Sequence, residues 1–396
     1  MTHHQKEYLP LWNTYVSDHP KRALQEREGL LFALEQGTNV DFQSVSLGVL
    51  LSLFQRDRYG HWKADPILDV SHMRALCRAI LDKKEACPLL RQGILDAFFF
   101  DTYGRRTSLN TTERVFLQER LCAMRFCRPS SFYMGALDKD HLADDEVEEP
   151  RHRVEFSTGF SIFCHPVTQL LWTEVMGYNP SFFRGLARPV EWVNWCDAIV
   201  FCNRLSERDG LEPAYIFPHR LFAALEQQSK DWENRPKDEE WEDLDDSIDS
   251  LAQQVQWNRN AHGYRLPTEA EWEFAARAHQ GFLYAGTDQA DDVWQERTSQ
   301  ASTQPVGQKE PNGFGLFDMS GNVYEWVWDR EGREYTEESI VDPVHEDRES
   351  EERVLRGGSF RYRPWSTRVS ARAEDFPSRR QEIIGFRVAR TIERSS

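Results

Sequence analysis

The stretch GFGLFDMSGNVYEW, residues 313–326, is the most informative part of this chain of 396 residues. Three further strings accompany it in a fixed order: GYRLPTEAEWEFAAR at residues 263–277, RGGSF at 356–360 and GFRV at 385–388. Four such strings in one order are far more specific than a single glycine-rich loop. Together they indicate one particular type of domain in the second part of the chain.

Composition predicts a packed, acidic, globular protein. The chain is long enough for two domains, and 40% of its residues are hydrophobic, with 13 Trp and 24 Phe in the sequence. The formal net charge of −17 argues against non-specific binding to nucleic acid or to an anionic membrane, since phosphate contacts would have to overcome a repulsive field. We therefore expect a partner that is neither nucleic acid nor membrane.

Targeting signals and cysteines indicate the cytoplasm. No apolar run reaches membrane-spanning length, and the opening residues MTHHQK are not followed by the apolar core of a secretory signal. The 7 cysteines are odd in number and lack the tight spacing of a disulfide framework. We expect a cytoplasmic protein whose cysteines are reduced thiols.

The four strings resemble the formylglycine-generating enzyme (sulfatase-modifying factor) family, whose fold is a variant of the C-type lectin fold. The resemblance covers roughly residues 130–392 and implies an α+β domain over residues 128–396. The family contains both oxidases and catalytically silent binding proteins. The residues at the catalytic positions therefore indicate which of the two classes is expected here.

Residues 1–127 have a different texture. Turn residues are sparse and apolar residues recur at helical spacing, as at Leu30, Leu31 and Leu34, which predicts an all-α domain whose last helix covers residues 113–126. One branch of the resembled family, the ergothioneine-type sulfoxide synthases, binds iron through a histidine triad in such a domain. No two histidines here stand four residues apart, so we expect an adaptor or oligomerisation module instead. The histidines considered are His3, His4, His19, His61 and His72.

Helix starts can be read within the second domain. Thr168 precedes an amphipathic run as an N-cap, and residues 196–208 form a second helical stretch. Thr268 with Glu271 three positions on makes a capping box. The tryptophans of this domain are expected in its core.

An acidic insertion interrupts this domain. The family usually has a short link after Tyr215, whereas this chain inserts residues 216–258. Within it, residues 231–249 hold ten acidic residues and two basic ones, which predicts a solvated helix or a mobile loop. A second acidic loop spans residues 334–352. The alternative is that these loops dock a basic partner and make the protein a scaffold.

The turn in the first string is a candidate calcium site. Asp318 and Glu325 bracket a turn with Gly321 and Asn322 at its tip, and calcium takes carboxylate and carbonyl oxygens. The resemblance implies the side chains of Asp318 and Glu325 and the carbonyls of Gly321 and Val323 as ligands. The alternative is that both carboxylates hold the loop through hydrogen bonds. A second family site, beginning at Asp292 and Val293, lacks its later acidic ligand here.

The resemblance also shows what is missing for catalysis. The oxidases of the family hold copper with two cysteines, five residues apart, just after Gly-Gly-Ser, and these positions read Tyr362 and Thr367 here. No cysteine follows Cys202. Because soft thiolates select Cu(I), we expect no copper and no formylglycine formation. The alternative is a metal-dependent oxidoreductase that uses another site.

Aromatic and arginine side chains replace the active site. These residue types anchor interfaces, and from Arg353 onward the chain has eleven arginines against four acids. The segment is similar in placement to the variable region of lectin-fold proteins diversified by retroelements. We expect a non-catalytic binding module for a protein ligand, or alternatively an arginine surface paired with the acidic loop 334–352. The predicted ligand-binding residues are Phe360, Arg361, Tyr362, Arg363, Trp365, Phe376, Arg379, Arg380, Gln381 and Glu382.

Overall fold

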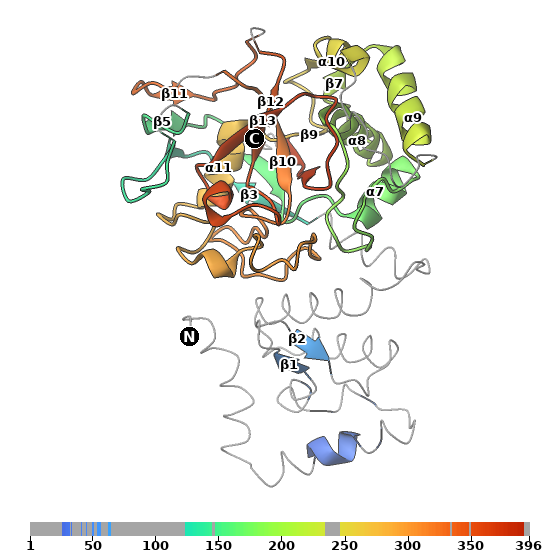
Figure 1. Ribbon diagram of the computed structural model, residues 1–396, viewed down its shortest axis with the longest axis vertical. Coiled ribbons are helices and arrows are strands. Elements are labelled where there is room, and N and C mark those ends of the chain that lie inside the picture. Colours follow the sequence, from blue (N-terminus) through green and yellow to red (C-terminus); the bar gives the residue numbers. More distant parts are fainter. Residues whose placement is uncertain are drawn as a thin grey trace. The chain divides into compact units, whose positions relative to one another are not determined.

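The computed structural model describes most of residues 123–391 and short stretches between residues 26 and 64. The gaps in the longer range are 145–146, 234–245, 333–334 and 348–349. The chain divides into two compact units, Met1–Arg106 and Thr107–Ser396 (Figure 1). Among the described helices, none combines the length and the apolar character that a bilayer crossing requires.

The described part of the first unit is not all helical. Residues 26–31 are helical, as the period predicts, but β1 (Phe54–Arg56) runs antiparallel to β2 (Trp62–Ala64). The prediction of an all-α domain over residues 1–127 is therefore wrong at this strand pair. Three residues are too few to show a two-residue period in the sequence. The candidate histidines lie outside the described residues.

A second correction concerns the end of the helix predicted over residues 113–126. Met124–Cys127 form β3, which pairs antiparallel with β6 (Phe160–Phe163), Met124 lying opposite Phe163. These residues, which the prediction placed in the first domain, thus complete a sheet of the second unit. The partner strand lies far along the sequence, and local spacing does not reveal such a pairing.

The described residues of the second unit form four small sheets. The first has the order β13-β12-β10-β14, with β13 (Arg372–Asp375), β12 (Arg353–Arg356), β10 (Tyr324–Arg330) and β14 (Ile384–Phe386). The second has the order β11-β5-β4, with β11 (Ile340–Val341), β5 (His152–Glu155) and β4 (Ser131–Met134). The third has the order β3-β6-β15-β9, with β15 (Ala389–Thr391) and β9 (Tyr264–Arg265). The fourth pairs β7 (Tyr215–Ile216) with β8 (Gln256–Trp257).

The helices of the second unit begin where the sequence predicts. The Thr168 side chain caps α7 (Gln169–Met176), and Thr268 with Glu271 forms a capping box on α11 (Glu269–Arg277). α8 (Trp195–Arg208) begins one residue earlier than predicted, because Asn194 forms a capping box with Asp197. α9 (His219–Glu233) and α10 (Asp246–Ala252) flank residues 234–245. Figure 1 shows α7, α8, α9 and α10 grouped on one side of this unit.

The far end of the acidic insertion is part of the core. Asp249 on α10 is buried and accepts hydrogen bonds from the backbone nitrogen and the hydroxyl of Ser378, both at 2.8 Å. Ile248 and Leu251 pack in the same apolar cluster as Trp195 and Trp326. The prediction of a solvated helix or mobile loop over residues 231–249 is therefore wrong for α10. No run of apolar residues in the sequence indicates that this helix is buried.

The four strings quoted at the outset meet in the first sheet and on α11. Glu325 of β10 lies opposite Arg356 of β12 on one side and opposite Gly385 of β14 on the other. The Trp272 indole of α11 donates to Glu325 Oε2 at 2.7 Å. Each of the four strings therefore contributes residues to one buried cluster around Glu325. These shared contacts explain why the four strings occur together.

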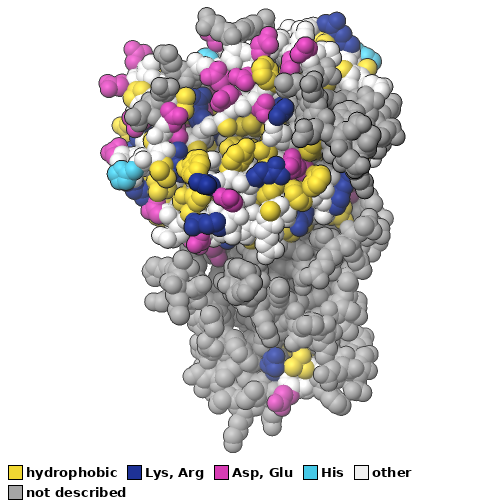
Figure 2. Space-filling view, viewed as in Figure 1, with side chains coloured by type: hydrophobic (Ala, Val, Ile, Leu, Met, Phe, Trp, Pro, Cys, Tyr) yellow, Lys and Arg dark blue, Asp and Glu magenta, His cyan; other side chains and the backbone are white. Residues whose placement is uncertain are grey.

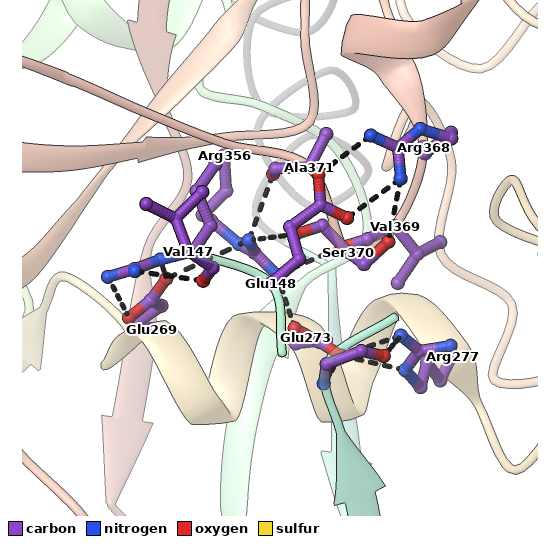
Figure 3. A network of polar contacts seen from close by, with 12 residues as sticks. Val147, Glu148, Glu269, Glu273, Arg277, Arg356, Arg368, Val369, Ser370 and Ala371 are labelled. Atoms are coloured by element: carbon purple, nitrogen blue, oxygen red, sulfur yellow. Dashed lines mark hydrogen bonds and ion pairs between the residues drawn. The ribbon is translucent and has the colours of Figure 1, made fainter. Parts of the chain in front are cut away.

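Buried ion pairs fix this centre (Figure 3). The Arg356 guanidinium is completely buried, pairs with Glu273 of α11 and donates to the carbonyls of Val369, Ser370 and Ala371. The other Glu273 oxygen accepts from Arg277 Nε at 2.8 Å. Arg356 thereby ties the Gly-Gly-Ser string to the chain thirteen to fifteen residues further on.

Two neighbouring arginines repeat the arrangement. Arg368 makes a bidentate contact with Glu148, with both N–O distances at 2.7 Å, and also pairs with Asp140. Arg372 pairs with Glu269 of α11 at 2.6 Å. All three partners are buried, so the charges are screened little by solvent. The chain that follows Arg356 is thus anchored on both sides of residues 360–367.

We expect Glu273→Gln to lower the free energy of unfolding by about 3 kcal/mol, because it removes the nearest carboxylate from the buried Arg356 guanidinium and leaves only Glu269, at 3.7 Å, as its counter-charge among the described residues. Asp291→Asn is the matched control, since its pair with Arg297 is exposed and should cost at most about 0.5 kcal/mol. Both are measured by urea unfolding. Equal stabilities of the two variants would show that the buried pair does not hold the fold.

Candidate functional site

The segment between the two anchors carries exposed aromatic side chains. Tyr362 and Trp365 are 41% and 46% exposed, which is unusual for such large rings. The Arg363 guanidinium lies 5.3 Å from the Trp365 ring centroid, and Trp365 is part of a short 3-10 turn, Pro364–Thr367. The Tyr362 ring contacts the Tyr324 ring edge-on, with centroids 5.7 Å apart. These side chains form the centre of a surface that we name the aromatic platform.

The neighbouring loop completes the platform. Arg361, itself exposed, pairs with Glu382 at 2.5 Å, which joins the two predicted segments. Arg379 pairs with Asp375 at 3.7 Å. Phe376 and Gln381 are half-buried beside them. Eight of the ten predicted ligand-binding residues, Glu382 among them, are thus exposed or half-buried. The Arg361–Glu382 pair connects the two segments on which they lie.

Two predicted ligand-binding residues do not reach the surface. Phe360 is 1% exposed and packs edge-on against Phe183, with centroids 5.3 Å apart. Arg380 is 4% exposed and pairs at 2.7 Å with Asp197, in the first turn of α8. Both are therefore structural: Phe360 fills the core beneath the platform, and Arg380 secures the start of α8. Their residue types alone did not separate them from their exposed neighbours.

Phe182 is an exposed aromatic residue that the sequence did not single out. It is 55% exposed and contacts the Phe183 ring, which in turn lies against Phe360 under the platform. Buried Glu191 holds this turn by accepting from the backbone nitrogens of Phe182 and Phe183 at 3.0 and 2.7 Å. The turn residues around Phe182 predict a loop, but nothing in them shows which ring faces outward.

Burial raises the pKa of Glu191 to about 8, and the nearby charge of Glu382 contributes in the same direction. The backbone hydrogen bonds from Phe182 and Phe183 act in the opposite direction. The loop that borders the platform therefore rests on a carboxyl group that titrates near neutral pH.

The predicted calcium turn is built around an ion pair. The Arg387 guanidinium contacts both oxygens of Glu325, at 2.8 Å from Nη2 to Oε1 and 2.9 Å from Nε to Oε2. Together with the Trp272 indole, it occupies the Glu325 carboxylate fully. Arg387 also donates to the carbonyls of Phe163 and Phe317. An ion bound to Glu325 would have to displace this guanidinium.

Asp318 is the exception within this turn. Its Oδ2 accepts from the backbone nitrogen of Gly307 at 2.7 Å, whereas Oδ1 is buried without a partner. Burial raises its pKa to about 7. In the described residues, no three His, Cys, Asp or Glu side chains cluster as metal ligands. Of the two carboxylates in the predicted calcium set of Asp318, Gly321, Val323 and Glu325, that of Asp318 thus has an oxygen to offer, whereas that of Glu325 is already paired with Arg387.

The positions of the family's copper cysteines have separate environments. Tyr362 is exposed, whereas Thr367 is buried and its hydroxyl donates to the Pro364 carbonyl at 3.0 Å. Burial raises the pKa of the Cys127 thiol to about 12 and also raises those of Cys196 and Cys202. These thiols stay protonated, and a protonated thiol is a poor metal ligand.

The arginines near the C-terminus divide into buried and exposed groups. Arg356, Arg368, Arg372, Arg380 and Arg387 are buried or half-buried and pair with carboxylates from α8, α11, β10 or the loop after β4. In the acidic loop 334–352, Glu346 pairs with Arg259 instead. The exposed members of the group stand on the platform. Figure 2 shows a face of the second unit on which hydrophobic side chains lie among those of Lys and Arg.

Comparison with known proteins places this geometry in a family context. The family model for the sulfatase-modifying factor enzyme 1-like domain matches residues 115–392. The chain is 37% identical to the chaperone protein LppX of Paenibacillus barcinonensis over 191 residues, which are 43% of this chain and 62% of that protein. It is 38% identical to the formylglycine-generating enzyme of Streptomyces coelicolor over 159 residues, or 34% of this chain and 49% of that enzyme. The chain thus spans between half and two thirds of the length of these relatives.

Among solved structures, the second unit is similar to Treponema denticola variable protein 1. The superposition has a TM-score of 0.56 at 32% sequence identity and covers 68% of this chain and 95% of that chain. The predicted family and its relation to variable proteins are therefore confirmed, and so is the α+β character of the second unit.

We expect Glu325→Gln to lower the free energy of unfolding by about 3 kcal/mol, because Arg387 then lacks its buried partner. The loss should be the same in EGTA as in millimolar calcium, since the pair rather than a metal holds the turn. Glu296→Gln, in an exposed pair with Arg363, is the control. If calcium instead raises the melting temperature of the wild type but not of Glu325→Gln, the calcium prediction stands.

Glu191 should make stability depend on pH. Its folded pKa of about 8 lies above the ordinary value of 4.5, so its contribution is complete below about pH 4.5 and is lost as the pH rises through 8. From about pH 5 to 8 the wild type should lose up to a few kcal/mol relative to Glu191→Gln. Unfolding curves of both proteins at intermediate pH values measure this difference. Parallel pH profiles would mean that Glu191 is already ionised in the folded protein.

Proposed function

The chain belongs to the sulfatase-modifying factor enzyme 1-like domain family, and from this membership we propose that residues 128–396 form a non-catalytic binding module. Its fold is a variant of the C-type lectin fold, and its ligand is a protein that contacts the aromatic platform. The observation that carries the proposal is the exposure of Tyr362 and Trp365 on a segment anchored at both ends by buried arginines.

Exposed aromatic rings beside arginines suit a protein ligand. Tyr, Trp and Arg dominate the energetics of protein interfaces, because they bury large areas with few rotatable bonds. Trp365 with Arg363 gives one such pair, Tyr362 and Arg361 are exposed beside it in the chain, and Phe182 adds a third ring at the edge. Arg361 is already oriented by Glu382. A partner can therefore contact the platform without first having to order the side chains of the platform.

The anchoring lowers the cost of binding. Ordering a loop on association consumes part of the binding free energy, so a segment that is already fixed binds more tightly. Arg356 fixes the chain before the platform, and Arg368 and Arg372 fix it after. These contacts are independent of the exposed side chains, which allows Arg361, Tyr362, Arg363 and Trp365 to vary without loss of the fold, whereas Phe360 and Thr367 are buried.

The chemistry at the former copper positions also supports a binding role. A phenol and a hydroxyl stand where the resembled oxidases have thiolates, and the Thr367 hydroxyl is already used within the turn. The described cysteines with raised thiol pKa values lie in the core. We further propose a cytoplasmic location, and an adaptor or oligomerisation role for residues 1–127.

Replacing Tyr362 and Trp365 by Ala should weaken partner capture at least about tenfold, because two interface anchors are lost. The melting temperature should change by only about 2 °C, since both side chains are largely exposed. Capture is quantified by mass spectrometry of proteins retained by the immobilised full chain, and the retained protein is then titrated against each variant.

Tyr133→Ala is the matched control, because this ring is 54% exposed but lies on β4, outside the platform. It should retain full capture. Phe360→Ala should lower the melting temperature, since that ring is buried. Capture that survives the double variant would refute the platform as the binding site. Oxygen consumption with stoichiometric copper or iron in the purified protein would favour the oxidoreductase alternative.

A further inference from the structure

A cavity of about 490 Å³ opens at the end of the first sheet, apart from the platform. β10 relates the two sites: its first residue, Tyr324, contacts Tyr362, whereas its last residue, Arg330, lines the cavity. The rim carries amide side chains from the end of the acidic insertion, and the floor is buried. The rim amides are Gln253, Gln256, Asn258 and Asn260.

Arg353, at the start of β12, forms part of the floor. It is 2% exposed, and its guanidinium lies 3.9 Å from the Trp195 ring centroid and 5.2 Å from that of Trp328. Nη1 donates to the Trp328 carbonyl at 2.5 Å. Nε is buried without an acceptor, and none of the hydrogen bonds between described residues uses Nη2. One edge of this guanidinium therefore has no oxygen to bind.

Arg353 differs from several other buried arginines of this unit because it contacts no carboxylate of the described residues. Arg265, Arg356 and Arg387 each contact a buried carboxylate, from Glu271, Glu273 and Glu325 respectively. The ion pairs between described residues do not include Arg353. Burial and the nearby charge of Arg330 lower the pKa of Arg353 to about 9, although the charge of Asp329 acts in the opposite direction without an ion-pair contact. A buried charge without a partner is costly, and here it borders a cavity.

The remaining charges at the cavity leave it positive. Three arginines line it, Arg259, Arg330 and Arg353, against one acid, Glu346. Glu346 is occupied, because it pairs with Arg259 at 3.0 Å and accepts from the Trp328 indole at 2.8 Å. In a chain with a net charge of −17, this cavity is therefore a local site for an anion.

We propose that this cavity binds a small organic carboxylate, which pairs with the Arg353 guanidinium while its polar substituents contact the rim amides. The Nε and Nη2 donors share one edge of a guanidinium, and a carboxylate satisfies two such donors with its two oxygens. The volume lies within the range of about 300–1,000 Å³ that is usual for small-molecule sites. Val255 and Trp328 supply apolar walls for the carbon skeleton.

Calorimetry on the full chain tests the proposal, with glucuronate, citrate and benzoate as probes and glucose as the neutral counterpart of glucuronate. At least one carboxylate should bind with saturation at one site, and glucose should not bind. Arg353→Lys keeps the charge but loses the two-donor edge, so the dissociation constant should rise about tenfold or more. Arg297→Lys, an exposed arginine outside the cavity, should bind as the wild type does.

A second variant guards against misfolding of Arg353→Lys. Gln256→Trp places a bulky ring on the exposed rim without touching the core, and it should likewise raise the dissociation constant about tenfold or more. In the wild type, the Arg353 Nε–H resonance, identified by its absence from the Arg353→Lys spectrum, should shift on titration. Three results would each overturn the proposal: no binding by any carboxylate, equal binding by Arg353→Lys, or tighter binding of inorganic phosphate than of every carboxylate probe.

Discussion

The buried pair between Arg356 and Glu273 is the interaction on which the second unit depends. It joins the Gly-Gly-Ser string to α11, and through Trp272 and Glu325 α11 is joined to the other two strings. Arg356 also lies over the Trp272 ring, at 5.4 Å from its centroid. Arg277 also pairs with Glu273, and Glu269 lies 3.7 Å from Arg356, so removing one charge would unbalance a whole buried cluster of charges. The contacts among the strings thus give them a role in folding.

The same contacts hold the exposed segment to the fold without using its exposed side chains. Arg356, Arg368 and Arg372 bind acids of α11 and of the loop after β4, so they fix the ends of the platform segment from below. Phe360 points into the core from the same segment and anchors its beginning. Side chains such as Tyr362 and Trp365 contribute little to these contacts. The fold and the exposed side chains of the proposed platform are therefore under separate physical constraints.

The sequence predicted what depends on local chemistry. The cap at Thr168 is indicated by the amphipathic run after it, that at Thr268 by Glu271 three positions on, and the family strings identify the α+β unit. It did not predict what depends on distant partners. Phe360 and Tyr362 are both aromatic and two residues apart, yet only the packing against Phe183 decides which one is buried. The burial of α10 was missed for the same reason, whereas β1 and β2 were missed because strands of three residues are too short to show a two-residue period.

Arginine has two distinct roles in this acidic protein. Where a carboxylate is buried beside it, as with Glu325 and Arg387, the pair closes and becomes part of the frame. Where the rings of Trp195 and Trp328 stand in for the carboxylate, as at Arg353, they stabilise the cation only in part, because a ring face attracts charge but accepts no strong hydrogen bond. The guanidinium donors of Arg353 that have no acceptor among the described residues belong to a residue that lines a cavity. A fold that balances its other buried cations so closely retains, at Arg353, an imbalance that an anionic ligand would relieve.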